Sequence, residues 1–99
     1  MINRSYTSTL TAAIGTVSET IYATNCILNQ IRVKATTATN VFDVKLVDVH
    51  GITIFEQKDI YGELADLPEI ALYGNITLTI SNSDADEAFT TLLVFKELS

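Results

Sequence analysis

Few side chains in this sequence are of types that carry chemistry. There is one cysteine and one histidine. Cys26 lies in Asn-Cys-Ile-Leu, a setting typical of a small buried apolar side chain, and a lone cysteine cannot form an internal disulfide. His50 precedes a turn glycine, and Asp48 is close enough in sequence to hydrogen-bond to it. A catalytic base also needs a nucleophile or an orienting carboxylate that the fold brings close. We interpret His50 as a turn-stabilising or solvated residue.

Metal ligands are equally scarce. A zinc site takes three or four ligands, mostly histidine and cysteine, and the chain offers two such residues in total. The segment NSDADEA (82–88), called the acidic loop below, gathers Asp84, Asp86 and Glu87. Calcium takes six to eight oxygens, but the loop lacks the EF-hand glycine, and strands are predicted on both sides of it. We predict a solvated hairpin loop, no metal or cofactor, and no enzymatic activity, because no nucleophile–base pair can be assembled.

The aromatic residues suggest a second kind of site. The chain has four tyrosines and no tryptophan. Tyr61 and Tyr73 lie near acidic and amide side chains, so with the acidic loop they form a weak candidate ligand set for a sugar. We favour the interpretation that both tyrosines cap the edges of the core, with the ring inward and the hydroxyl in water.

Composition excludes several function classes. The net charge is −6, from twelve acidic and six basic residues, and the basic residues are scattered singly. No basic stripe exists to neutralise phosphates, so we predict no nucleic-acid binding. No apolar stretch is as long as the apolar segment of a signal peptide or of a membrane span. We therefore expect a chain made in a cytoplasm and no membrane partner. The 47 % apolar and 18 % charged content argues against disorder.

Alternation with a period of two predicts strands almost everywhere. Apolar residues share one parity in residues 6–12, 17–23, 27–35, 42–46 and 76–81, as on strands with one buried face. After Leu46 the phase flips, which indicates either a bulge or a strand end covered on both sides. His50-Gly51 then forms a tight turn. The shared parity predicts a core that includes Ile31, Val33, Phe42, Val44, Leu46, Ile52, Ile54, Ile76, Leu78, Ile80, Leu93 and Phe95.

The number of strands predicts the architecture. Seven or eight short strands without a helical pattern favour an all-β, antiparallel β-sandwich of jelly-roll or immunoglobulin-like type, with a small β-barrel as the alternative. Residues 58–74 do not alternate and contain Pro68, so we expect a connection with a helical turn or an edge strand. Residues 1–99 form one domain, and 1–12 are a candidate polar N-terminal arm.

The last predicted strand, AFTTLLVFKEL (88–98), is apolar on both faces. Phe89, Leu93 and Phe95 share one face, and Leu92, Val94 and Leu98 share the other. Such a strand is central between two layers, or one of its faces meets another chain. The candidate interface residues are therefore Leu92, Val94 and Leu98, together with Tyr6 and Leu10 on the N-terminal segment.

The same segments carry a family resemblance. The chain has a Ser/Thr-rich start (residues 5–11) and Thr-rich strands poor in Lys, and FDVKLVDVHGITIF (42–55) is followed by YGNITLTISNSDADEAFTTLLVFKEL (73–98). In this it resembles the small β-sandwich virion proteins of tailed bacteriophages, the head-decoration (cement) proteins and the accessory proteins of heads and tails. The resemblance implies a non-enzymatic virion protein that binds a capsid or tail shell, often as a homotrimer. It implies no catalytic residues. The competing class is a carbohydrate-binding module of similar fold, which would use Tyr61, Tyr73 and the acidic loop.

Overall fold

A computed structural model describes residues 3–97. This part of the chain contains only strands, turns and loops, and no helix long and apolar enough to cross a membrane. The strands are β1 (Asn3–Ala12), β2 (Val17–Ile21), β3 (Thr24–Ala35), β4 (Val41–Val47), β5 (Thr53–Tyr61), β6 (Glu63–Asp66), β7 (Ile70–Tyr73), β8 (Ile76–Ser81) and β9 (Glu87–Glu97). The prediction of an all-β chain is confirmed.

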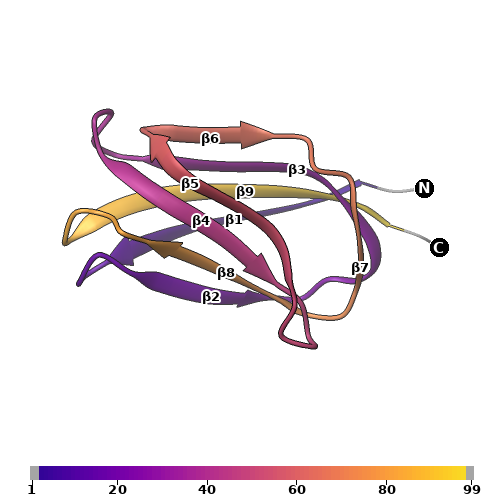
Figure 1. The fold of residues 1–99 in the computed structure, drawn as a ribbon. Helices are drawn as coiled ribbons and strands as arrows, with labels where there is room; N and C mark the ends of the chain where they lie inside the picture. The colour runs from indigo at the N-terminus through magenta and orange to yellow at the C-terminus, as the bar shows by residue number, and fades with distance from the viewer. Residues whose placement is uncertain (1–2, 98–99) are drawn as a thin grey trace.

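The strands form two antiparallel sheets that pack face to face (Figure 1). One sheet has the order β1-β9-β3-β6, with β7 also paired to β3, and the other has the order β2-β8-β4-β5. The pairs are nested along the chain, because β1 pairs with β9, β2 with β8, β3 with β6 and β7, and β4 with β5. This is the order of a long hairpin rolled up on itself, a jelly roll. The sheets keep free edges, so the molecule is the predicted sandwich and not the alternative closed barrel.

The core lies between the two sheets. Every residue predicted for the core is buried except Ile52 and Ile54. Phe42 of one sheet meets Phe89 of the other edge to face, with ring centroids 4.9 Å apart, an arrangement that aromatic pairs favour. Shared parity along each strand was therefore a sufficient signal for most of the core.

Ile52 is an error of the sequence prediction, since its side chain is 60 % exposed. It belongs to the turn that follows β4, where its carbonyl accepts a hydrogen bond from the Asp48 backbone amide. The bulge expected after Leu46 is not on β4: Leu46 pairs with Phe55 and Val47 with Thr53, so the extra residue is on the partner strand β5. That residue is Ile54, which is only partly buried against the core.

A second bulge explains an error in β3. Ile27 was predicted to share the buried face with Ile31, but it is only half-buried and points outward. The register shifts between Leu28 and Gln30, so Asn29 is an extra residue and the parity changes along the strand. Cys26 and Leu28 are therefore the buried residues before the bulge.

Residues 58–74 were predicted as a connection with a helical turn or an edge strand, and they are mostly strand. They include the end of β5 and the two short strands β6 and β7, which pair with successive parts of β3 on either side of Pro68. Ile60, Leu64 and Leu72 are buried. The candidate N-terminal arm, as far as residues 3–12 are concerned, forms β1 and pairs with β9 along its whole length.

Candidate functional site: the outer face of the five-stranded sheet

Strand β9 occupies the middle of the larger sheet, between β1 and β3. Its even-numbered residues Leu92 and Val94 point away from the core and are half-buried, while Leu98 lies outside the described residues. Leu92 lies across from Thr7 of β1 and Arg32 of β3. Val94 lies across from Ser5 and Gln30. The outward side of β1, β9 and β3 around Leu92 and Val94 is called the outer face below.

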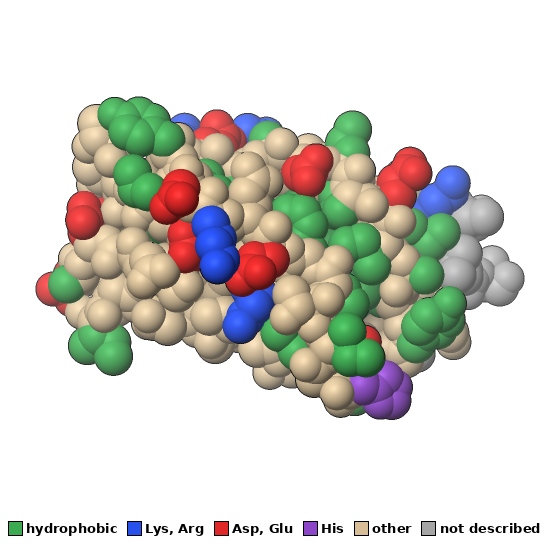
Figure 2. Space-filling view, viewed as in Figure 1, with side chains coloured by type: hydrophobic (Ala, Val, Ile, Leu, Met, Phe, Trp, Pro, Cys, Tyr) green, Lys and Arg blue, Asp and Glu red, His purple; other side chains and the backbone are tan. Residues whose placement is uncertain are grey.

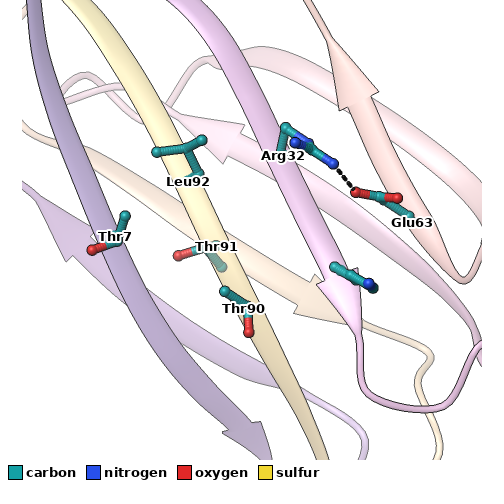
Figure 3. A pocket seen from close by; sticks show the side chains of 7 residues that line it. Thr7, Arg32, Glu63, Thr90, Thr91 and Leu92 are labelled. Carbon is teal, nitrogen blue, oxygen red and sulfur yellow. Dashed lines mark hydrogen bonds and ion pairs between the residues drawn. The ribbon is translucent and has the colours of Figure 1, made fainter.

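One feature of the outer face is a shallow groove of about 350 Å³. Figure 3 shows Leu92 on β9, flanked on one side by Thr7 on β1 and on the other by the ion pair between Arg32 on β3 and Glu63 on β6. Arg32 Nη2 lies 2.5 Å from Glu63 Oε2, and both side chains are more than a third exposed. An ion pair so exposed contributes little to stability. The pair forms one wall of the groove.

Two further depressions continue the groove along the sheet. One, of about 350 Å³, is lined by Asn3, Asn29, Gln30, Leu67, Glu69 and Val94. The other, of about 320 Å³, is lined by Ile27, Asn29, Glu69, Ala71 and Lys96. Threonine and amide side chains offer hydrogen bonds, and Leu92 and Val94 offer apolar area. The opposite sheet differs, because acidic and basic side chains intermingle over β4 and β5 (Figure 2).

Tyr6 and Leu10, proposed from sequence as interface residues, point inward from β1. The Tyr6 hydroxyl donates to Glu19 Oε1, and the Ser8 hydroxyl donates to Glu19 Oε2 at 2.9 Å. The hydrogen bond to Glu19, together with burial, raises the pKa of Tyr6. Leu10 packs against the core. These residues join β1 to β2 of the other sheet, so they do not belong to the outer face.

The acidic loop closes one end of the sandwich. Glu87 is buried, and its Oε2 and Oε1 accept hydrogen bonds from the backbone amide and the hydroxyl of Thr37 at 2.6 and 3.0 Å. Asn40, also buried, accepts a hydrogen bond from the Asp84 amide at 3.2 Å. Asp84 and Asp86 are exposed. Across residues 3–97, no three acidic, histidine or cysteine side chains gather as metal ligands would.

Tyr61 and Tyr73 are not turned inward as predicted, since their side chains are 67 % and 80 % exposed. They also lie at opposite ends of β3. Tyr73 pairs with Thr24 at the start of that strand, while Tyr61 precedes β6, which pairs with its end. The acidic loop shares the end near Tyr61, because Asn40 bonds both to Gly62 and to Asp84. The structure therefore does not bring the proposed ligand set together.

The remaining candidates for chemistry are His50, with its neighbour Asp48, and Cys26. One carboxylate oxygen of Asp48 accepts hydrogen bonds from the backbone amides of His50 and Ile52, each at 2.9 Å. His50 itself is exposed, and the histidine is visible at a corner of the molecule (Figure 2). Cys26 is fully buried, and this burial raises the pKa of its thiol. A buried thiol with a raised pKa is a poor nucleophile.

Sequence reasoning missed the neighbours of Leu92 and Val94. The signal was partly present, because Gln30, Arg32 and Lys34 share one parity in the sequence. Their partners across the sheet come from β1 and β9, which are distant in the chain.

Compared with models of protein families and with curated proteins, the sequence matches none.

Proposed function

We propose that this chain is a non-enzymatic virion structural protein, a decoration or accessory protein that binds the protein shell of a phage head or tail. The observation that carries the proposal is the outer face, where the central strand of a sheet presents Leu92 and Val94 between short hydroxyl side chains on β1 and longer polar side chains on β3. Apolar residues gathered on an outward surface mark interaction sites. The family resemblance of the sequence supplies the identity of the partner.

The chemistry of the outer face suits a flat protein partner. Threonine and serine on β1 lose little side-chain entropy when they are covered. Leu92 and Val94 provide a small apolar centre, and Arg32 and Lys34 lie to one side of it. Such a surface is complementary to a shell subunit that has an apolar patch next to acidic groups. The homotrimer expected from the resemblance would cover the same surface.

The fold alone leaves two classes open, because jelly rolls occur both in viral capsid proteins and in lectins. The carbohydrate-binding alternative relied on Tyr61, Tyr73 and the acidic loop. Tyr73 lies at the opposite end of β3 from Tyr61 and the acidic loop, so the three cannot contact one sugar together. The outer face supports the first class better. Neighbouring capsid, portal or tail genes would support it independently.

The test uses the double variant Leu92→Asp, Val94→Asp. We expect the wild-type chain to co-sediment with shells assembled from a capsid or tail protein encoded beside it. The double variant should lose this binding, and should dissociate any oligomer that forms through the outer face, yet keep its far-UV circular dichroism spectrum. Val47→Asp is the matched control, because Val47 is a half-buried outward residue of the other sheet.

Two results would contradict the proposal. If the double variant unfolds a chain that is monomeric as wild type, Leu92 and Val94 serve the fold and not a partner. If Val47→Asp weakens association as much as the double variant does, the effect comes from added negative charge and not from the outer face.

A further inference from the structure

The four lateral edges of the two sheets differ in how well they are protected. A free strand edge exposes backbone amides and carbonyls that can pair with another chain, and proteins usually blunt such edges. On β5 the register shifts twice, and the strand carries Glu56, Lys58 and Asp59; intermingled charges cover this region (Figure 2). Strand β2 has only five residues. Strands β6 and β7 have four residues each, on either side of Pro68.

Strand β1 has none of these protections. Its ten residues pair with β9 in an unbroken register, from Asn3 with Lys96 to Ala12 with Glu87. It contains no proline, and Arg4 is its one charged residue. Among the described strands it pairs with β9 alone. Ten residues at about 3.3 Å each give a straight, free edge about 33 Å long.

The edge is also held in place before any partner arrives. On its inner side, Tyr6 and Ser8 donate hydrogen bonds to Glu19 of β2. Arg4 Nε lies 2.6 Å from Glu97 Oε1, and its guanidinium lies 4.7 Å above the ring of Phe95. Because these side chains are already engaged, pairing at the edge requires little further ordering.

We propose that the β1 edge pairs antiparallel with β1 of a second copy of this chain, about a two-fold axis, so that the two large sheets become one continuous sheet. The proposal is independent of shell binding by the outer face. In the register centred on Thr7, Asn3 lies across from Thr11 and Ser5 across from Thr9. Short hydroxyl and amide side chains thus meet their like on the outer side, and Thr/Ser pairs across strands are favourable.

Charge also permits this pairing. In the register centred on Thr7, Arg4 of each copy lies across from Leu10 of the other, so no like charges meet. Because β1 has only one charged residue, it offers no charge pattern that a partner of different sequence could recognise. A second copy of β1 matches the strand in length and in the alternation of its side chains. The interface is isologous, as most homodimer interfaces are. It predicts a dimer, in contrast to the homotrimer that the family resemblance implies.

The experiment measures mass and amide exchange together. Sedimentation equilibrium of the full chain over a range from about 10 µM to 1 mM, where small interfaces associate, should show the mass rising from 10.8 kDa to twice that value. Over the same range, hydrogen exchange followed by NMR should slow at alternate amides of β1, those that face away from β9. A dimer formed through the outer face would leave these amides unchanged.

The variant Ser5→Lys, Thr9→Lys places lysines across from each other in the proposed dimer, and both residues are exposed. It should remain monomeric at 1 mM with an unchanged spectrum. The control Thr20→Lys, Thr53→Lys adds the same charge at exposed positions of β2 and β5 and should dimerise as wild type does. A monomer at every concentration, a trimer, or a dimer that the β1 lysines leave intact would each overturn the proposal.

Discussion

Substitution of glycine by alanine at two matched turns separates the cost of backbone conformation from the cost of crowding. Gly51 and Gly62 both have φ +79°. A Cβ added at Gly51 meets nothing within 4 Å, whereas one added at Gly62 lies 2.5 Å from the backbone oxygen of Ala38. A left-handed conformation costs a residue with a Cβ about 1–2 kcal/mol. Gly51→Ala should therefore reduce the free energy of unfolding by that amount alone.

Gly62→Ala adds the cost of moving two backbone segments apart. The amide of Gly62 donates to the Asn40 carbonyl, and its own carbonyl accepts from the Ala35 amide, both at 2.9 Å. Shifting Gly62 away from Ala38 weakens these bonds, each of which contributes about 0.5–1.5 kcal/mol net. The expected total loss is then about 2–5 kcal/mol, or about 1–3 kcal/mol more than for Gly51→Ala.

Urea unfolding followed by far-UV circular dichroism measures both losses, and an unchanged m-value confirms that the compared states are the same. In a thermal melt, Gly62→Ala should lower the Tm by about 5–20 °C more than Gly51→Ala does, at about 4–8 °C per kcal/mol for a domain of this size. Gly15→Ala should group with Gly62→Ala, because its Cβ would lie 2.7 Å from the Ser83 backbone oxygen. Equal losses at all three positions would refute the crowding argument.

Four further outcomes are expected. Leu78→Ala, at a fully buried position, should cost about 2–5 kcal/mol in urea unfolding; a loss under 1 kcal/mol would show that the core is loosely packed there. Hydrogen bonds from the Asp59 amide and Asn82 lower the pKa of Asp43. The stability this provides is present above the ordinary aspartate pKa and is lost as pH falls below about 4, so Asp43→Asn should flatten the acid limb of the stability curve. The raised pKa of Tyr6 works in the opposite range: its contribution is present below about pH 10 and is lost as pH rises further, and Tyr6→Phe should reduce the alkaline loss. Millimolar calcium should leave the Tm unchanged, and a rise of more than a few degrees would make the acidic loop a ligand set.

Strand identity and core parity followed from local sequence, because alternation between the faces of a strand is set by the backbone itself. Phe42, Val44 and Leu46 are buried as their spacing predicted. The same rule failed where a bulge inserted one residue. In β3 the shift at Asn29 turned Ile27 outward. The sequence showed a phase flip in β4, but the extra residue lies on its partner strand β5. Bulges depend on pairing with a partner strand, so a single strand's pattern locates them poorly.

For the outer face, too, the local sequence and the tertiary structure determined different features. The sequence by itself determined that Leu92 and Val94 are apolar residues on the opposite side of the last strand from Phe89, Leu93 and Phe95, since that depends on parity alone. Only the tertiary structure decided what surrounds them, by placing β9 between β1 and β3 and exposing the long free edge of β1. It also separated Tyr61 from Tyr73 by the length of β3. Pairing between strands distant in the chain is decided by burial and backbone hydrogen bonding of the whole sheet, and local sequence carries little record of it.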